Sequence, residues 1–307
     1  MRYLFGFCLF ILSLITSAAS INKIVVFGDS LSDNGNLYEY MNHQLPQSPP
    51  YYNGRFTDGP VWAERLARSY FAENYIPHLL DYAFGGAGVL SDENDDPAFF
   101  TLKREVDTYL LAHNDTVDPN ALYCVWIGGN NYLGLPQDID SSVNEVIEGI
   151  QKDLERLAQK GAKHILIMGL PNLGKVPLAK ELDAQAQFAV FSTKHNERLH
   201  NMYLNLRNVY PSIRWYYYDT NLTFENIFKN PQKYGFENIT DTCYEADSQD
   251  MSSPHAVLNL AASVNAKSYA SSPHDCNGYV FFDLIHPTQH IHQIAAKEIK
   301  KLLESSS

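Results

Sequence analysis

The stretch IVVFGDS at residues 24–30 joins four apolar residues to a glycine and two polar residues. A run of this kind, rich in β-branched and aromatic residues, is typical of a short strand buried on both faces of a parallel sheet. The glycine then marks a tight turn, which places Ser30 just beyond the carboxyl end of the strand. Ligands of open parallel sheets bind at these strand ends, so the turn is a candidate functional site.

Further apolar runs predict the other strands and the helices between them. Strands are expected at 122–127, 164–168 and 213–218. Helices are expected at 60–69, 141–159, 184–209 and 291–303, where several apolar residues recur at spacings of three and four. The stretches 37–57 and 243–276 are expected to be long loops. Strands that alternate with helices predict a three-layer α/β/α sandwich around a mostly parallel sheet, formed by a single domain at residues 21–307.

Residues 1–20 have the pattern of a secretory signal peptide. Arg2 supplies the positive charge, residues 3–15 are almost entirely apolar, and the small residues at 16–20 offer a cleavage site. The apolar run is too short to span a bilayer comfortably, and no second run is long enough to do so. We therefore expect a secreted, soluble protein, and the overall pattern favours a bacterial source.

The composition narrows the possible functions. The formal net charge is -12 at pH 7, so the basic surface that nucleic-acid binding requires is not expected. Of the 4 cysteines, Cys8 lies in the signal segment. We predict that Cys243 and Cys276, which flank a polar loop, form a disulfide, and that Cys124 is a buried thiol in a strand. The cysteine spacing suggests no zinc site.

Four polar or glycine-rich segments stand where the predicted sheet would bind a ligand. They are GDSLSDNGN at 28–36, YAFGGAG at 82–88, GGNN at 128–131 and DLIHP at 283–287. Each has an ordinary explanation when it is taken alone. A serine after a strand commonly caps a helix, a Gly-Gly-Asn sequence forms a turn, and a glycine-rich loop can bind phosphate.

In this order, the four segments closely resemble the sequence blocks of the GDSL lipases, also called SGNH hydrolases. The resemblance extends from about Lys23 to the last predicted helix. It implies a flavodoxin-like fold and ester hydrolysis that requires no metal and no cofactor. The third block of the family often reads GxND, and Asn131 stands here in place of that aspartate. Because that aspartate is not the partner of the catalytic base, we expect little consequence.

The resemblance also implies the catalytic roles. Ser30 would attack the ester carbonyl, His286 would accept its proton and pass it to the leaving alcohol, and Asp283 would orient and stabilise the imidazole. The backbone N–H groups of Ser30 and Gly86, with the side-chain amide of Asn130, would form the oxyanion hole. The short spacing between Asp283 and His286 allows one loop to deliver both groups.

Five neighbouring polar residues are given structural roles. Asp29, Asp33 and Asn34 are expected to brace the turn through hydrogen bonds from the backbone to their side chains. His290 and His292 are expected to be ordinary residues of the last helix.

Within the family, the chain looks like the secreted bacterial lysophospholipases A and glycerophospholipid–cholesterol acyltransferases. This likeness rests on the segments 27–36, 53–62 and 82–88 and on the cysteine-bracketed loop; the segment 53–62, which contains Arg55 and Trp62, is expected to shape the cleft. The expected substrate is a lysophospholipid, reached by transient contact with a membrane surface. We expect a monomer, with acyl transfer to an alcohol where the site excludes water.

Three alternatives remain. A carbohydrate or short-chain acyl esterase would use the same residues and differ in its preference for small acyl groups. A non-catalytic binding module is disfavoured because all five catalytic positions are present. A flavodoxin-like phosphate-binding protein is disfavoured by the DLIH segment.

The loop bracketed by Cys243 and Cys276 carries apolar residues between 256 and 264. We interpret it as a lid or lipid-contacting flap over the site, and the alternative is an inert surface insertion.

Overall fold

The computed structural model describes residues 21–90, 100–244 and 276–305. The predicted signal peptide and the interior of the loop bracketed by Cys243 and Cys276, with its lid hypothesis, lie outside the described residues. Among the helices of the described ranges, none is long and apolar enough to cross a membrane.

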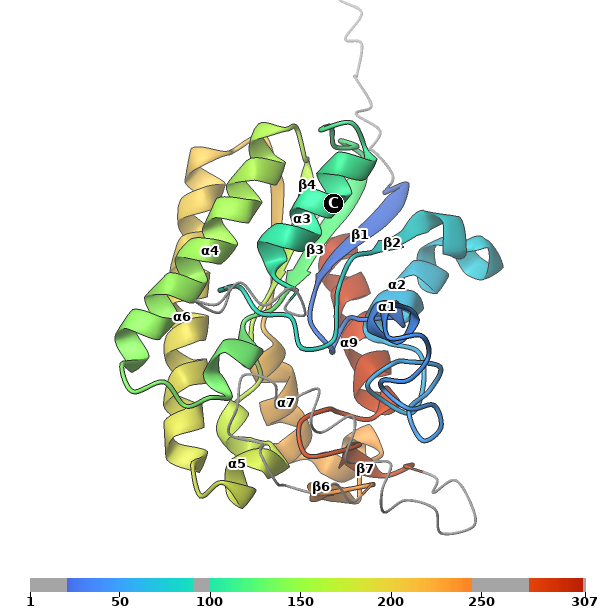
Figure 1. The fold of residues 1–307 in the computed structure, drawn as a ribbon, viewed down its shortest axis with the longest axis vertical. Coiled ribbons are helices and arrows are strands. Elements are labelled where there is room, and N and C mark those ends of the chain that lie inside the picture. Colours follow the sequence, from blue (N-terminus) through green and yellow to red (C-terminus); the bar gives the residue numbers. More distant parts are fainter. Residues whose placement is uncertain (1–20, 91–99, 245–275, 306–307) are drawn as a thin grey trace, which may run out of the picture.

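A five-stranded parallel sheet forms the centre of the fold (Figure 1). Its spatial order is β2-β1-β3-β4-β5, which is the flavodoxin-like order, with the reversal of strand order next to β1 and β3. The strands are β1 (Lys23–Gly28), β2 (Leu79–Asp81), β3 (Ala121–Trp126), β4 (His164–Met168) and β5 (Arg214–Tyr218). The predicted mostly parallel sheet is therefore confirmed.

Helices cover both faces of the sheet. On one face lie α2 (Trp62–Phe71) and α9 (Gln289–Ser305), and on the other lie α3 (Leu102–Ala112), α4 (Ile139–Gln159) and α6 (Gln185–Val209) (Figure 1). Alternate strand residues enter two apolar clusters: Ile24 and Val26 pack on the α2 and α9 side, and Val25 and Phe27 pack on the other. Burial on both faces explains why the strands are continuous apolar runs.

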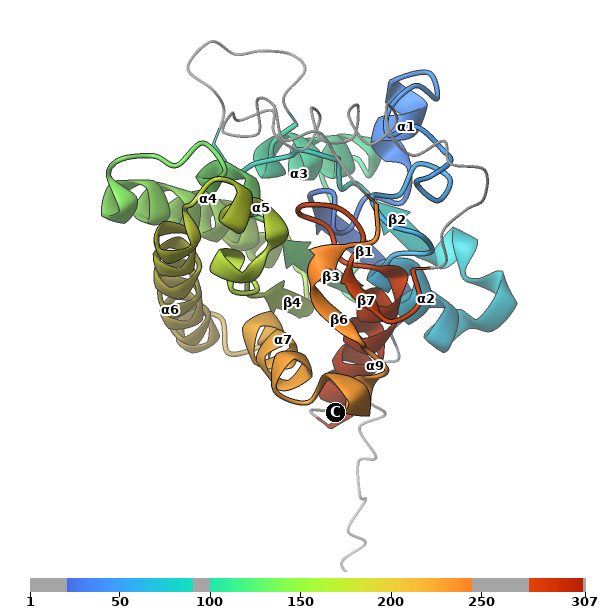
Figure 2. The same ribbon diagram turned by 90° about the horizontal axis from the view of Figure 1, so that it is seen from below.

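The remaining elements lie mainly around the carboxyl ends of the strands. Figure 2 shows a small parallel sheet beside α7 and α9. It consists of β6 (Asn238–Thr242) and β7 (Tyr279–Phe281). The other α-helices are α1 (Asn36–Tyr40), α5 (Pro177–Glu181) and α7 (Thr220–Lys229). Short 3-10 helices span Ala72–Asn74, Ile76–His78, Gly129–Tyr132, Leu173–Lys175 and Pro231–Tyr234.

The helix predicted at 141–159 is α4 in the structure, and both of its ends have an identifiable cause. At the start of α4, the side chain of Asp138 accepts a hydrogen bond from Ser141 N–H at 2.9 Å. Past its end, Gly161 has a φ of 107°, a left-handed conformation that glycine adopts without strain.

The loop predicted at 37–57 was wrong in its first residues, because α1 occupies Asn36–Tyr40. This helix is too short for apolar residues to recur in it at helical spacing.

Candidate active site

Ser30 and Asn130 lie at the ends of neighbouring strands. Ser30 follows β1 by two residues, and Asn130 lies in the 3-10 helix that follows β3. Because β1 and β3 pair in parallel, with Gly28 opposite Trp126, their carboxyl ends open on the same edge of the sheet. Asp283 and His286 arrive from the segment between β7 and α9. The site therefore forms at the strand ends that the sequence indicated.

The three side chains predicted to act together meet in the structure. His286 Nε2 lies 2.8 Å from Ser30 Oγ, and His286 Nδ1 lies 2.7 Å from Asp283 Oδ2. Asp283 and His286 have no exposed surface, and Ser30 is 4% exposed. Both imidazole nitrogens are thus within hydrogen-bonding distance of a partner, and the pair is shielded from bulk solvent.

The Asp283 carboxylate receives hydrogen bonds from several donors. Its Oδ1 accepts from the backbone N–H groups of Ile285 and His286, at 2.8 and 2.7 Å. Its Oδ2 accepts from the hydroxyl of Tyr51 at 2.8 Å. Donors to a carboxylate stabilise its charged form. Sequence reasoning missed Tyr51, because it lies in a Pro-rich stretch far from Asp283 and carries no local signal.

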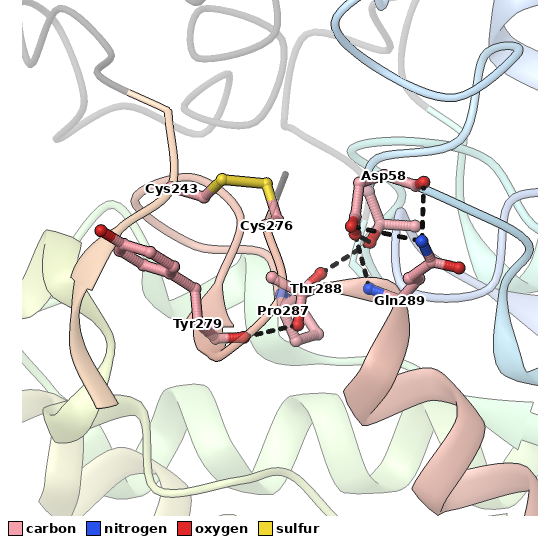
Figure 3. Close-up of a disulfide and its surroundings, with 8 residues drawn as sticks. Asp58, Cys243, Cys276, Tyr279, Pro287, Thr288 and Gln289 are labelled. Carbon is pink, nitrogen blue, oxygen red and sulfur yellow. Dashed lines mark hydrogen bonds between the residues drawn. A yellow bond between two sulfur atoms is a disulfide. The ribbon is translucent and has the colours of Figure 1, made fainter. Parts of the chain in front are cut away.

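The segment that holds Asp283 and His286 is anchored on both sides (Figure 3). Before it, the predicted disulfide joins Cys243 to Cys276. After it, Thr288 Oγ1 donates to the Tyr279 carbonyl at 2.7 Å, and Gln289 N–H donates to Asp58 Oδ1 at 2.6 Å. By the chain-entropy argument, a disulfide across 33 positions stabilises the fold by about 3–4 kcal/mol.

The turn that carries Ser30 depends on a glycine and on buried carboxylates. A Cβ at Gly28 would lie 2.5 Å from the Trp126 carbonyl oxygen, so only glycine fits there. Asp29 Oδ1 accepts from Leu31 N–H at 3.0 Å, and Asp33 accepts from the backbone N–H groups of Gly35, Asn36, Leu37 and Gly85. The predicted bracing by both aspartates is present.

A nearby amide also braces the turn. Asn36 Nδ2 donates to the carbonyls of Asp81 and Ala83, both at 2.9 Å. This amide lies two residues beyond Asn34, which the sequence had singled out. Burial raises the pKa of Asp29 to about 6, although the Leu31 N–H and His286 oppose the increase. Asp29 therefore carries a negative charge at neutral pH.

Arg55 and Trp62 have supporting roles next to the turn that carries Ser30. Arg55 pairs with Glu64 at 2.7 Å, and Trp62 Nε1 donates to Ser32 Oγ at 3.1 Å. Neither residue is among those that line the pocket beside Ser30. These two side chains of the segment 53–62 therefore support the turn instead of lining the pocket. Phe56, from the same segment, does reach the site, with its ring 5.1 Å from the His286 ring.

Of the predicted oxyanion donors, Ser30 and Asn130 line the pocket beside the nucleophile. Among the described residues, the backbone N–H groups of Ser30 and Gly86 donate to no acceptor, which leaves both free to bind a ligand. Asn130 Nδ2 donates to the Ala87 carbonyl at 2.8 Å, which fixes the orientation of its amide. Gly86 has a φ of 81°, so a glycine suits this position.

Asn131, the departure from the family pattern, has a structural role. Its Oδ1 accepts a hydrogen bond from Val89 N–H at 2.9 Å. A carboxylate oxygen could accept the same bond, so the amide preserves this contact between the loops that follow β2 and β3. This geometry supports the expectation of little consequence.

The two histidines of the last helix differ from each other. His292 is 2% exposed, and its Nδ1 accepts from Trp62 N–H at 3.3 Å. Burial, aided by the nearby charges of Arg65 and His286, lowers the pKa of His292 to about 3, so its ring remains a neutral acceptor. It therefore ties α9 to α2. His290 packs its ring against Phe236 at 4.7 Å.

An apolar pocket opens beside the nucleophile turn. Ser30 and Asn130 lie at its polar part, and its volume is about 50 Å³. The apolar residues around it come from the end of β3, from the segments after β1, β3 and β4, from α7 and from the β7 region. They are Leu31, Trp126, Leu133, Leu170, Pro171, Leu173, Val176, Phe224, Phe281, Ile285 and Pro287. A hydrocarbon group attached to a carbonyl at Ser30 can bury its first carbons here.

Glu105 on α3 lies behind the nucleophile turn. Its Oε2 accepts from Gly28 N–H at 2.8 Å, while its buried Oε1 has no partner among the described residues. Burial raises the pKa of Glu105 well above the ordinary value, and the charges of Asp81, Asp29 and Asp33 add to this effect. Folding therefore favours the protonated carboxyl.

The first prediction follows from this raised pKa. At pH 8 the Glu105 carboxyl is ionised in the unfolded chain. In the folded state this carboxyl must either stay protonated or carry a buried negative charge. Glu105→Gln should therefore raise the free energy of unfolding by about 1–3 kcal/mol at pH 8. The gain should shrink toward zero as the pH falls to about 4.5, where the unfolded chain also begins to bind the proton. Chemical denaturation at pH 8 and pH 5 measures this difference. The surface variant Glu73→Gln serves as control, and an equal effect of Glu105→Gln at both pH values would contradict the prediction.

Within residues 21–90, 100–244 and 276–305, no three His, Cys, Asp or Glu side chains are placed to hold a metal ion. A serine, a histidine and an aspartate in contact at the strand ends of an α/β sandwich are the groups that acyl transfer from an ester requires. The fold and the site thus define the class as an ester hydrolase.

The sequence profile of the family described as GDSL-like Lipase/Acylhydrolase matches residues 24–299. The chain belongs to this family, as the four sequence segments indicated.

Three relatives show the range of the family. The chain is 29% identical to the phosphatidylcholine-sterol acyltransferase of Aeromonas hydrophila, over 94% of this chain and 92% of that protein. It is 30% identical to the secreted effector protein SseJ of Salmonella typhimurium and 31% identical to the thermolabile hemolysin of Vibrio parahaemolyticus, over 91% and 94% of this chain. The chain spans 63% and 64% of the length of these two relatives.

Proposed function

We propose that the protein is a secreted serine esterase that hydrolyses the acyl ester of lysophospholipids. The observation that carries the proposal is the apolar pocket that opens directly at Ser30 and Asn130. An acyl carbonyl at Ser30 would lie between a nucleophile and a set of donors, with its hydrocarbon chain against apolar side chains. The name of the Aeromonas relative, which refers to phosphatidylcholine, supports a glycerophospholipid substrate.

In the proposed mechanism, His286 Nε2 removes the proton from Ser30 Oγ, 2.8 Å away, as the oxygen attacks the carbonyl carbon. The resulting oxyanion is stabilised by the N–H groups of Ser30 and Gly86 and by the Asn130 amide. His286 then gives the proton to the departing glycerol oxygen, and an acyl-enzyme forms. Water, activated by the same histidine, releases the fatty acid and restores Ser30.

Asp283 acts on this sequence through the imidazole. With Oδ2 2.7 Å from Nδ1, it holds the proton on Nδ1, which leaves Nε2 free to accept from Ser30. Its charge also stabilises the imidazolium that forms during attack. If an alcohol replaces water in the second half of the reaction, the product is a new ester, which is acyl transfer.

A short-chain or carbohydrate esterase is the second candidate. The pocket volume of about 50 Å³ fits an acetyl group or the first carbons of a longer chain, so a long chain must extend beyond it. A glycan substrate would place its small acyl group in the same pocket. The two candidates therefore differ in whether a long acyl chain is accepted.

The second prediction separates these candidates. Purified protein should release fatty acid from lysophosphatidylcholine faster than it releases acetate from an acetylated sugar. Val176→Trp, which fills the pocket, should lower kcat/KM for the lysophospholipid by about tenfold or more, because the lost apolar burial is about 1–3 kcal/mol. Exposed Val209→Trp is the control for the added ring. Cleavage of acetyl esters alone would transfer the assignment to the carbohydrate or short-chain esterase.

Export and membrane contact complete the proposal. The pattern of residues 1–20 supports secretion, and a disulfide between Cys243 and Cys276 suits an oxidising compartment. The enzyme acts as a monomer that contacts a membrane surface briefly to take up its lipid.

A further inference from the structure

We infer that Tyr51 is a positioning residue of this site, which sets the proton affinity of the Asp283–His286 pair. The inference rests on the proposed function, because it concerns the residues that the mechanism uses. Tyr51 is 1% exposed, and its hydroxyl donates to Asp283 Oδ2 at 2.8 Å. The same oxygen lies 2.7 Å from His286 Nδ1, so two donors share it.

The environment keeps the tyrosine hydroxyl protonated. Burial raises the pKa of Tyr51 well above its ordinary value, and the charge of Asp283 raises it further. Tyr51 is therefore a donor throughout the working pH range. A hydroxyl that donates to a carboxylate favours the ionised form, which matters most where both partners are out of water.

Aromatic packing fixes the tyrosine ring. Its centroid lies 5.0 Å from that of Phe282 and 5.9 Å from that of Phe56. Phe56 in turn lies 5.1 Å from the His286 ring. The loop between α1 and α2 thus supplies a hydrogen bond to Asp283 and an apolar cover to His286. A Cβ at Gly85 would lie 2.3 Å from the Phe56 ring, so the glycine allows this cover to close.

The balance of donors decides how tightly the Asp283–His286 pair binds its proton. With Tyr51 present, part of the charge on Oδ2 is neutralised, so Asp283 stabilises the imidazolium less. Without it, Asp283 becomes the stronger acceptor and holds the protonated imidazole more tightly. The acid limb of the kcat profile reports this difference.

Tyr51→Phe removes only the hydroxyl. With a short-chain aryl ester as substrate, it should move the acid limb of the kcat profile up by about one pH unit, lower kcat by up to about tenfold on that limb, and leave KM within about twofold. Tyr109→Phe is the matched control, because Tyr109 is also 1% exposed and its hydroxyl lies 2.8 Å from that of Tyr123. This control should keep the wild-type profile.

A double-mutant cycle distinguishes positioning from general support of the fold. In the Asp283→Asn background, Tyr51→Phe should cause little further loss, because its acceptor charge is already gone. An additional tenfold loss there, or an unshifted acid limb in the single variant, would overturn the inference. Fluorotyrosine at position 51, a stronger donor of nearly the same shape, should move the limb in the opposite direction and tests the inference if Tyr51→Phe does not fold. Wild-type protein without ester hydrolysis would instead refute the proposed function itself.

Discussion

Replacing Ser30 with alanine should lower kcat for ester hydrolysis by roughly five to six orders of magnitude, the loss seen when the nucleophile of a catalytic triad is removed. The reason is that Ser30 Oγ lies 2.8 Å from His286 Nε2, at the mouth of the apolar pocket. The change removes one buried oxygen, so the melting temperature should stay within a few degrees. Initial rates with lysophosphatidylcholine and with a short-chain aryl ester measure the effect.

Ser32→Ala is the control for this prediction. Ser32 lies in the same turn, and its Oγ accepts from Trp62 Nε1 at 3.1 Å, but it makes no contact with His286 in the structure. Its loss should cost less than about tenfold. A Ser30→Ala protein that retains more than a hundredth of the wild-type kcat would show that another group performs the attack.

Asp283→Asn should lower kcat by about four orders of magnitude and change KM little. An asparagine amide next to His286 Nδ1 donates a hydrogen bond to that nitrogen, so the neutral imidazole carries its proton on Nε2 instead. Nε2 then cannot accept the proton of Ser30. The fold should remain intact, since the asparagine oxygen can still accept from the backbone N–H groups of Ile285 and His286.

The exposed variant Asp241→Asn is the control for this substitution, and it should behave as wild type. Thermal unfolding of both variants separates loss of catalysis from loss of structure. A decrease in kcat below tenfold for Asp283→Asn would show that the imidazole is oriented by another group.

The sequence predicted the central sheet because its strands are buried on both faces. In β1, β3 and β4 this burial produces continuous apolar runs, which are visible without any structure. β2 has three residues, all partly exposed, and was not predicted. A strand of this length is recognised only through its pairing with β1, which is a tertiary property.

The candidate site also contains residues that the sequence predicted and residues that it did not. Ser30, Asn130, Asp283 and His286 lie in short segments whose residue types and order are visible in the chain. Tyr51 and Glu105 were missed because their roles arise from contacts across 232 and 77 positions of sequence. Nothing in the residues around either position indicates such a partner.

We propose that Ser30 is the activated nucleophile of an ester hydrolase. Treatment of the wild-type protein with a fluorophosphonate, followed by peptide mapping by mass spectrometry, tests it most directly. We expect one phosphonate per molecule, attached to Ser30, with esterase activity lost in step with labelling and no label on the Ser30→Ala variant. A label on a different residue, or full esterase activity in protein whose Ser30 is modified, would contradict it.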